Sequence, residues 1–328
     1  MQNLPVKSIV VTGTNGKSTT CKLIEHVLRV NKMDAQLGGN IGKPILDLKI
    51  KKNSIVIIEA SSFQLFYTKF IKPTFAVILN IAKDHLDWHG TIKNYKNSKF
   101  NIFSKQDNQG YALLNNQELI KQFRKKKFLS KLKKIQDNTL EKYIKNKYLL
   151  SKTNLENASF AYELSNIFKI KKKITLKAFN TFKGLPHRNE IFYQKRGTTF
   201  INDSKATSFE AAQHALKNNK NIFWIVGGLP KLGDKFNLKS VRKNIIKSYI
   251  IGKHINYFKK QIEKSIKYKI SFNLKEALED IFQDLQLYKK IKATVLLSPA
   301  SASYDQFNNF VERGNQFKKL TLKYAKKF

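Results

Sequence analysis

The chain has 328 residues, 41% of them hydrophobic, enough for about two globular domains at ~150 residues each. Its formal net charge is +39 at pH 7, but we expect no nucleic-acid partner, because the basic residues are nearly all lysine and are spread along the chain. A single cysteine excludes an internal disulfide, and no apolar run reaches the ~18 residues of a membrane helix. We therefore expect a cytoplasmic protein without membrane insertion.

Short apolar runs recur along the chain and indicate an α/β fold. They lie at residues 9–11, 55–58, 75–79, 199–201, 222–226, 249–251 and 294–297. Segments of helical period follow them, which is the pattern of a parallel sheet covered by helices. Residues 105–150 are rich in lysine, and their periodicity does not decide between short strands and turns. We expect the domain break near "FKGLPHRNE", residues 182–190, where Gly and Pro interrupt a helical stretch.

The first run leads into a glycine-containing loop, "TGTNGKST", residues 12–19. The general nucleoside-triphosphate loop G-x-x-x-x-G-K-[ST] would require glycine at Val11. The order of strand, glycines, Lys-Ser and helix nevertheless predicts phosphate binding, since backbone N–H groups can approach a phosphate and Lys17 adds charge. A hydroxyl of Ser18 or Thr19 can hold Mg²⁺. The alternative is an ordinary glycine turn before a helix.

Acidic and imidazole side chains follow the next two runs. Glu59 comes directly after four apolar residues, where an unpaired carboxylate would be costly to bury. The segment "KDHLDWHG" then brings Asp84, His85, Asp87 and His89 into one loop. Glu59 and His85 could together hold a divalent cation beside the phosphates. Taken alone, His85 would be an ordinary loop residue.

Three strand ends in the second half carry polar side chains. They are Asp203, Ser204, Lys205 and Thr207; Gly227, Gly228 and Lys231; and Ser298, Ser301, Ser303 and Asp305. Each could be an ordinary turn with a helix cap. Because ligands bind beyond the carboxyl ends of parallel strands, three such ends on one edge suggest a second substrate site.

Taken together, these motifs resemble the Mur ligases, the ATP-dependent amide-forming enzymes of peptidoglycan synthesis, and most closely their D-glutamate-adding members. The motifs are "TGTNGKS", "GGNIG", "SSFQL", "GLPHR", "NDSKAT" and "SPASASYDQF", in the family's order from about residue 9 to the C-terminus. In this family TGTNGK[ST] is the usual loop, which accounts for Val11. The resemblance implies a central ATP-binding domain with a mostly parallel P-loop-type sheet over residues 1–183. A Rossmann-like glutamate-ligase domain would follow over residues 184–328.

The resemblance also implies roles for single residues. ATP would contact Gly13, Thr14, Asn15, Gly16, Lys17, Ser18, Thr19, Asn154, Asn157, Arg188 and Asp203. Two Mg²⁺ ions would be held by Ser18, Glu59, His85 and Lys99, with Lys99 carbamylated. The muramoyl substrate would contact Asn40, and D-glutamate would contact Lys205, Thr207, Lys231, Ser303 and the backbone of Phe310. Catalysis would depend on Lys17, Glu59, His85, Lys99 and Lys205.

The implied reaction joins D-glutamate to UDP-N-acetylmuramoyl-L-alanine through an acyl phosphate, and so serves cell-wall synthesis, cell shape and cell division. We expect a monomer. The family normally has a further UDP-binding domain ahead of the first strand, which is not seen before residue 9. We expect either a truncated chain or a UDP site supplied by another polypeptide. Leu229 stands where the family often has an acid, Ser301 where cysteine is common, and Lys83 where an acid is frequent.

Two alternatives remain open at this point. A folylpolyglutamate synthase-like ligase shares both domains and lacks the UDP domain, but usually has Gly-Ser after the loop lysine, whereas Ser18 and Thr19 follow Lys17 here. A partner-dependent, non-catalytic nucleotide-binding fragment is an alternative of another class.

Overall fold

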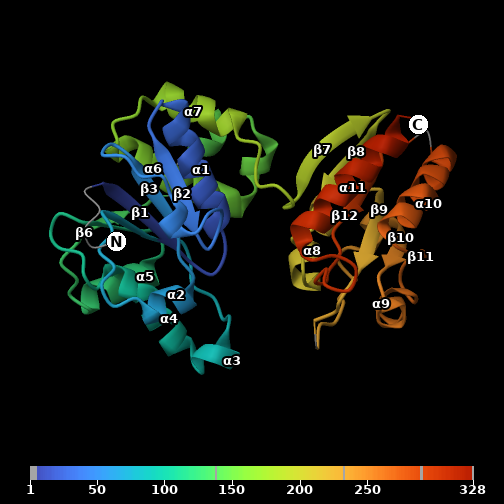
Figure 1. The fold of residues 1–328 in the computed structure, drawn as a ribbon, viewed down its shortest axis with the longest axis horizontal. Helices are drawn as coiled ribbons and strands as arrows, with labels where there is room; N and C mark the ends of the chain where they lie inside the picture. Colours follow the sequence, from blue (N-terminus) through green and yellow to red (C-terminus); the bar gives the residue numbers. More distant parts are fainter. Residues whose placement is uncertain (1–5, 137–138, 232, 289–290, 327–328) are drawn as a thin grey trace. The chain divides into compact units, whose positions relative to one another are not determined.

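The computed structural model describes residues 6–136, 139–231, 233–288 and 291–326. The chain divides into two compact units, Met1–Gly184 and Leu185–Phe328. Each unit has its own six-stranded sheet with helices packed on it (Figure 1). The predicted α/β class, with mostly parallel sheets, is confirmed. Among the described residues, no helix combines the length and apolar character needed to cross a bilayer.

The sheet of the first unit is wholly parallel, in the order β2-β3-β1-β4-β5-β6. Its strands are β1 (Lys7–Thr12), β2 (Ala35–Gly39), β3 (Ile55–Glu59), β4 (Phe75–Ile78), β5 (Tyr111–Leu114) and β6 (Lys131–Lys134). The central strands β3 and β4 are buried at every position. Continuous apolar strands of this kind are expected where helices cover both faces of a sheet.

The helices of the first unit form two layers. They are α1 (Lys17–Val30), α2 (Ser62–Tyr67), α3 (Leu86–His89), α4 (Ile92–Phe100), α5 (Gln117–Lys125), α6 (Lys152–Ile167) and α7 (Lys172–Thr181). Short 3₁₀ turns occur at η1 (Ile45–Asp47), η2 (Asn101–Phe103), η3 (Thr139–Tyr143) and η4 (Lys147–Leu150). Helices α1, α6 and α7 share one apolar core with the sheet, and α2, α4 and α5 contribute to another. The lysine-rich stretch 105–150 thus contains strands as well as turns.

The second unit has the strand order β11-β10-β9-β12-β8-β7. Its strands are β7 (Glu190–Lys195), β8 (Thr198–Asn202), β9 (Ile222–Gly227), β10 (Ile245–Ile251), β11 (Tyr268–Phe272) and β12 (Thr294–Leu297). Strand β7 pairs antiparallel with β8, and the other pairs are parallel. The helices are α8 (Phe209–Asn218), α9 (Ile255–Ile262), α10 (Leu274–Leu287) and α11 (Phe310–Ala325), with a 3₁₀ turn η5 (Arg242–Asn244).

The topology of the second unit brings the three predicted strand ends together. Strand β12 lies between β8 and β9 and runs parallel to both. Helices α8 and α9 share one core with the sheet, whereas α10 and α11 belong to the other. The segments that follow β8, β9 and β12 therefore lie along one edge, as their polar side chains suggested.

Candidate active site

The loop between β1 and α1 has the backbone of a phosphate cradle. Gly16 takes a φ of +85°, and a Cβ added there would lie 2.4 Å from Oδ1 of Asn157. The N–H of Thr14 donates to the carbonyl of Asn80 at 2.9 Å, which holds the loop over the end of β4. Val11, by contrast, lies inside β1, fully buried and paired with its neighbouring strands. The general motif's first glycine is therefore replaced by an ordinary strand residue.

Two lysines converge on this loop. Nζ of Lys17 donates to the carbonyls of Gly13 and Thr14, both at 2.8 Å. Nζ of Lys99, from α4, donates to the same Gly13 carbonyl at 2.9 Å and lies 4.6 Å from the ring centre of Tyr95. Lys99 is only 1% exposed. Burial, with a smaller contribution from the charge of Lys17, lowers the pKa of Lys99 to about 7.

Glu59, at the end of β3, is a buried carboxylate with an unsatisfied oxygen. Its Oε1 accepts a hydrogen bond from Nδ2 of Asn40 at 3.0 Å, and its Oε2 is buried with no partner among the described residues. An orphaned carboxylate oxygen costs free energy unless a cation or donor reaches it. Because Glu59 pairs in register with Val11, its backbone lies beside the start of the phosphate loop. An oxygen-lined position here suits Mg²⁺.

His85 lies at the N-terminus of α3 and is exposed. Its Nε2 is 3.5 Å from the carboxylate of Asp84, and its ring packs 4.9 Å from that of Phe63. The ring of Tyr95 is 6.4 Å away, and the Tyr95 hydroxyl hydrogen-bonds Thr14 Oγ1 at 3.0 Å. Tyr95 thus connects His85 to the loop. Within the described ranges, no three His, Cys, Asp or Glu side chains form a ready metal cluster.

The remaining first-unit residues lie along α1 and α6. Ser18 and Thr19, in the first turn of α1, are buried. Asn157 packs against Gly16, and its Nδ2 donates to Oδ1 of Asn154 at 3.3 Å. Nδ2 of Asn154 in turn donates to the carbonyl of Tyr148 at 2.7 Å. Asn157 therefore places α6 against Gly16 of the loop, and Asn154 connects α6 to the 3₁₀ turn η4.

In the second unit, Asp203 is the buried carboxylate at the end of β8. Its Oδ2 accepts from the hydroxyl of Ser298 at 2.7 Å, and its Oδ1 accepts from the N–H of Asn189 at 3.0 Å. Burial raises the pKa of Asp203 to about 6; these two hydrogen bonds and the charge of Arg188 only partly oppose the shift. The carboxylate is held in one orientation at the strand-end edge.

The predicted D-glutamate residues come from all three strand ends. Nζ of Lys205 lies 4.0 Å from the ring centre of Phe310, the first residue of α11. The carbonyl of Phe310 accepts from Ser204 Oγ at 2.8 Å. Ser303 is buried, whereas Lys231 is exposed. Thr207 is partly exposed, two residues before α8.

Comparisons with known proteins show the family of this chain. The family model of the Mur ligase middle domain matches residues 11–182. The UDP-N-acetylmuramoylalanine--D-glutamate ligase of Rickettsia felis is 35% identical over 339 residues, which cover 97% of this chain and 75% of that one. This chain belongs to the Mur ligase family. The ligase of the same name from Rickettsia bellii is also 35% identical, over 337 residues covering 95% of this chain and 75% of that one.

Solved structures share the fold of this chain at lower identity. Crystal structure II of MurF from Acinetobacter baumannii has a TM-score of 0.69 and 17% identity, covering 99% of this chain and 78% of that one. E. coli FolC in complex with DHPP and ADP has a TM-score of 0.66 and 15% identity, covering 98% of this chain and 90% of that one. At identities of 15% and 17%, these two structures show only that the fold is shared.

Sequence reasoning missed Arg313, which organises the second-unit site. Its side chain is buried in α11; Nε donates to Ser204 Oγ at 3.0 Å, and Nη2 donates to the carbonyls of Ser204 and Ser301, both at 2.9 Å. Burial lowers the pKa of Arg313 to about 10. It joins the segment after β8 to the segment after β12. No local pattern distinguishes it, because a single arginine within a basic helix is usually solvated.

Proposed function

We propose that this chain adds D-glutamate to UDP-N-acetylmuramoyl-L-alanine, with ATP converted to ADP and phosphate, as an acid–amino-acid ligase of peptidoglycan synthesis. The observation that carries this proposal is the name shared by relatives 35% identical over nearly the whole chain. The phosphate loop and the buried Glu59 support the nucleotide half of the reaction. The strand-end lysines Lys205 and Lys231 support binding of a small diacid. A nucleotide-activated precursor is a cytoplasmic substrate, which suits a chain with one cysteine.

In the first step the carboxylate of the muramoyl-L-alanine attacks the γ-phosphorus of ATP, and ADP leaves. The predicted ATP-binding domain, residues 1–183, would bind the nucleotide: the loop amides and Lys17 would hold phosphate oxygens, and Asn154 and Asn157 would hold the nucleoside. Lys17 would exchange its present bonds to Gly13 and Thr14 for phosphate oxygens. Asn40 would orient the acceptor carboxylate.

A Mg²⁺ ion would suit the orphaned Glu59 oxygen. The Ser18 hydroxyl would hold the same ion, and His85 and carbamylated Lys99 would hold a second one. When bound, these ions neutralise charge on the phosphates. Lys99 is suited to carbamylation because only a neutral amine attacks CO₂, and a pKa of about 7 leaves about half of the amines neutral at pH 7. Tyr95 and the Gly13 carbonyl hold that amine in place.

In the second step the amine of D-glutamate attacks the acyl phosphate, and the amide forms as phosphate leaves. The predicted glutamate-ligase domain, residues 184–328, would supply this substrate site and would also contact ATP through Arg188 and Asp203. Lys205, Lys231 and the hydroxyls of Thr207 and Ser303 would bind the two carboxylates of D-glutamate, with the backbone of Phe310 beside them. No covalent enzyme nucleophile takes part.

The test is ADP release by the full chain, measured with each substrate omitted in turn and with the product mass determined. Release should require both the muramoyl precursor and D-glutamate, and Lys17→Ala should abolish it. Turnover unchanged by Lys17→Ala would show that the phosphate-loop assignment is wrong. A second candidate, glutamate addition to a folate, is favoured only by the shared fold with FolC. It would be supported instead if a reduced folate and L-glutamate released ADP.

A further inference from the structure

The loop between β9 and β10 carries Lys231 and, three residues later, Asp234. The backbone N–H of Asp234 donates to the carbonyl of Lys231 at 3.1 Å, so both residues belong to one turn. Gly233 has a φ of +76°, a conformation that glycine adopts readily. Contacts that hold Asp234 in place therefore also restrict the backbone of Lys231.

The side chain of Asp234 joins this turn to the segment that follows β8. Its Oδ2 accepts from the backbone N–H of Phe209 at 2.8 Å. Phe209 is the first residue of α8 and follows Thr207 by two positions. A carboxylate is favourable at this place because the first N–H groups of a helix lack partners within the helix. One carboxylate thus connects two segments assigned to D-glutamate.

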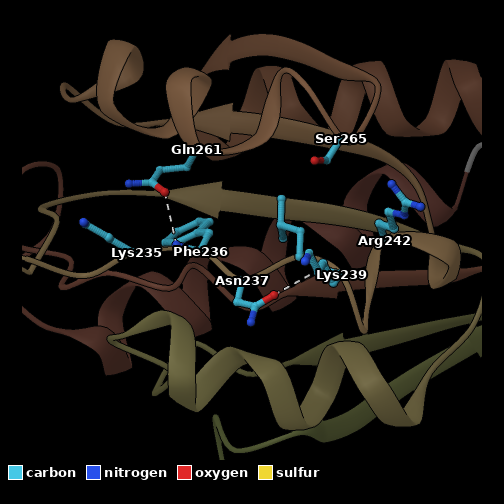
Figure 2. Close-up of a pocket in the computed structure, with 8 residues that line it drawn as sticks. Lys235, Phe236, Asn237, Lys239, Arg242, Gln261 and Ser265 are labelled. Carbon is cyan, nitrogen blue, oxygen red and sulfur yellow. Dashed lines mark hydrogen bonds between the residues drawn. The ribbon is translucent and has the colours of Figure 1, made fainter.

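Helix α9 also contacts this turn through hydrogen bonds. The Asp234 carbonyl accepts from the hydroxyl of Tyr257 and from Nε2 of Gln261, the latter at 3.4 Å. Oε1 of Gln261 accepts from the backbone N–H of Phe236 at 3.1 Å, as Figure 2 shows. The ring of Phe236 then stacks on that of Phe209, with centroids 4.3 Å apart. The turn is therefore tied to α8 by both a hydrogen bond and a ring contact.

We propose that Asp234 is a positioning residue for D-glutamate, which keeps the Lys231 turn and the Thr207 segment at a fixed separation. The inference rests on the proposed function. A diacid held at both carboxylates needs its two binding segments placed together, and ordering a loop only when ligand binds weakens affinity. Lys231 is exposed and gains little order from packing, so its position depends on the turn. Asp234 touches no reacting atom in this role.

The test compares steady-state kinetics of the full chain with those of Asp234→Ala and Asp234→Asn. Asp234→Ala should raise KM for D-glutamate about 10- to 100-fold while kcat and KM for ATP stay within about twofold. Asp234→Asn should restore KM to within about threefold of wild type, because its amide oxygen still accepts from Phe209. Asp280→Ala is the matched control, since it removes a carboxylate that bonds Ser271 and Lys269 elsewhere in this unit.

If the wild type turns over D-glutamate normally, either of two kinetic outcomes would overturn the inference. They are an unchanged KM in Asp234→Ala, and a parallel change in kcat and every KM that Asp234→Asn does not rescue. Absence of D-glutamate turnover in the wild type would instead refute the proposed function. Hydrogen exchange then tests the bond between the Phe209 N–H and the Asp234 carboxylate directly. Asp234→Ala should accelerate exchange at the Phe209 amide, and Asp280→Ala should not. Equal exchange at the Phe209 amide in the wild type and both variants would overturn the inference that Asp234 holds this segment.

Discussion

Replacing Asp203 by asparagine should stabilise the second unit at neutral pH. Burial raises the pKa of this carboxyl from 3.8 to about 6, despite the hydroxyl of Ser298 and the amide of Asn189 that favour its ionised form. At pH 7 the folded protein therefore holds a carboxylate that would be more stable in water. Asparagine removes the charge and keeps an oxygen that can accept from Asn189.

The size of the effect follows from the pKa difference of about two units, which corresponds to about 3 kcal/mol at ~1.4 kcal/mol per unit. The folded state of the wild type binds the proton more tightly than the unfolded state. The contribution of Asp203 protonation to the free energy of unfolding is thus fully present below pH 3.8 and is lost as the pH rises through about 6. Asp203→Asn lacks this loss, so the free energies of unfolding of variant and wild type should diverge between pH 4 and pH 8.

The chain contains two tryptophans, Trp88 in the first unit and Trp224 in the second. Trp224 is buried, and its Nε1 donates to the carbonyl of Ser298 at 2.7 Å, close to Asp203. In a Trp88→Phe background, urea unfolding followed by Trp224 fluorescence reports this unit. Asp203→Asn should gain about 3 kcal/mol relative to its parent at pH 8 and little at pH 4. An equal difference at both pH values would refute the reasoning.

Two further changes test the loop and the buried arginine. Gly16→Ala adds a Cβ 2.4 Å from Asn157 Oδ1 at a φ of +85°. The loop should therefore be displaced, and calorimetry should show that the affinity for ADP is at least about tenfold weaker. An unchanged affinity would contradict the close contact. Arg313→Met leaves the carbonyls of Ser204 and Ser301 without their donors, which should cost about 2–4 kcal/mol in urea unfolding of the second unit. A change below about 0.5 kcal/mol would indicate that water replaces the guanidinium.

The phosphate loop could be predicted from sequence because its determinants are local. Glycines, a lysine and a hydroxyl between an apolar run and a helical segment leave few other conformations. The structure begins α1 at Lys17 and gives Gly16 a positive φ, as that pattern requires. Such a pattern is lacking in part of the stretch 105–150, where periodicity does not decide between strands and turns. Strand β6 (Lys131–Lys134) is a mostly exposed edge strand of lysines, and its backbone pairing with β5 leaves no signal in side-chain hydropathy.

Contacts between distant segments could not be predicted. Asp234 follows Lys231 by three residues, and nothing in this spacing indicates which segment its carboxylate contacts. The structure instead turns its carboxylate toward the N–H of Phe209, and Leu229 forms an antiparallel bridge with Ala302. Such pairings depend on which strands become neighbours. Strand order joins segments separated by tens of residues, and side-chain chemistry alone does not encode it.

Lys99 shows how burial separates a reactive lysine from the many others. The chain has 62 lysines and arginines, so being a lysine does not by itself mark Lys99 as reactive. A solvated lysine of pKa 10.5 is neutral about once in 3,000 at pH 7, whereas a pKa of about 7 makes about half of the amines neutral. The enclosure that produces this difference comes from α4, Tyr95 and the Gly13 carbonyl, and Lys17 adds a second positive charge nearby. The reactivity proposed for Lys99 is therefore a property of the folded loop, and unfolding the first unit should remove it.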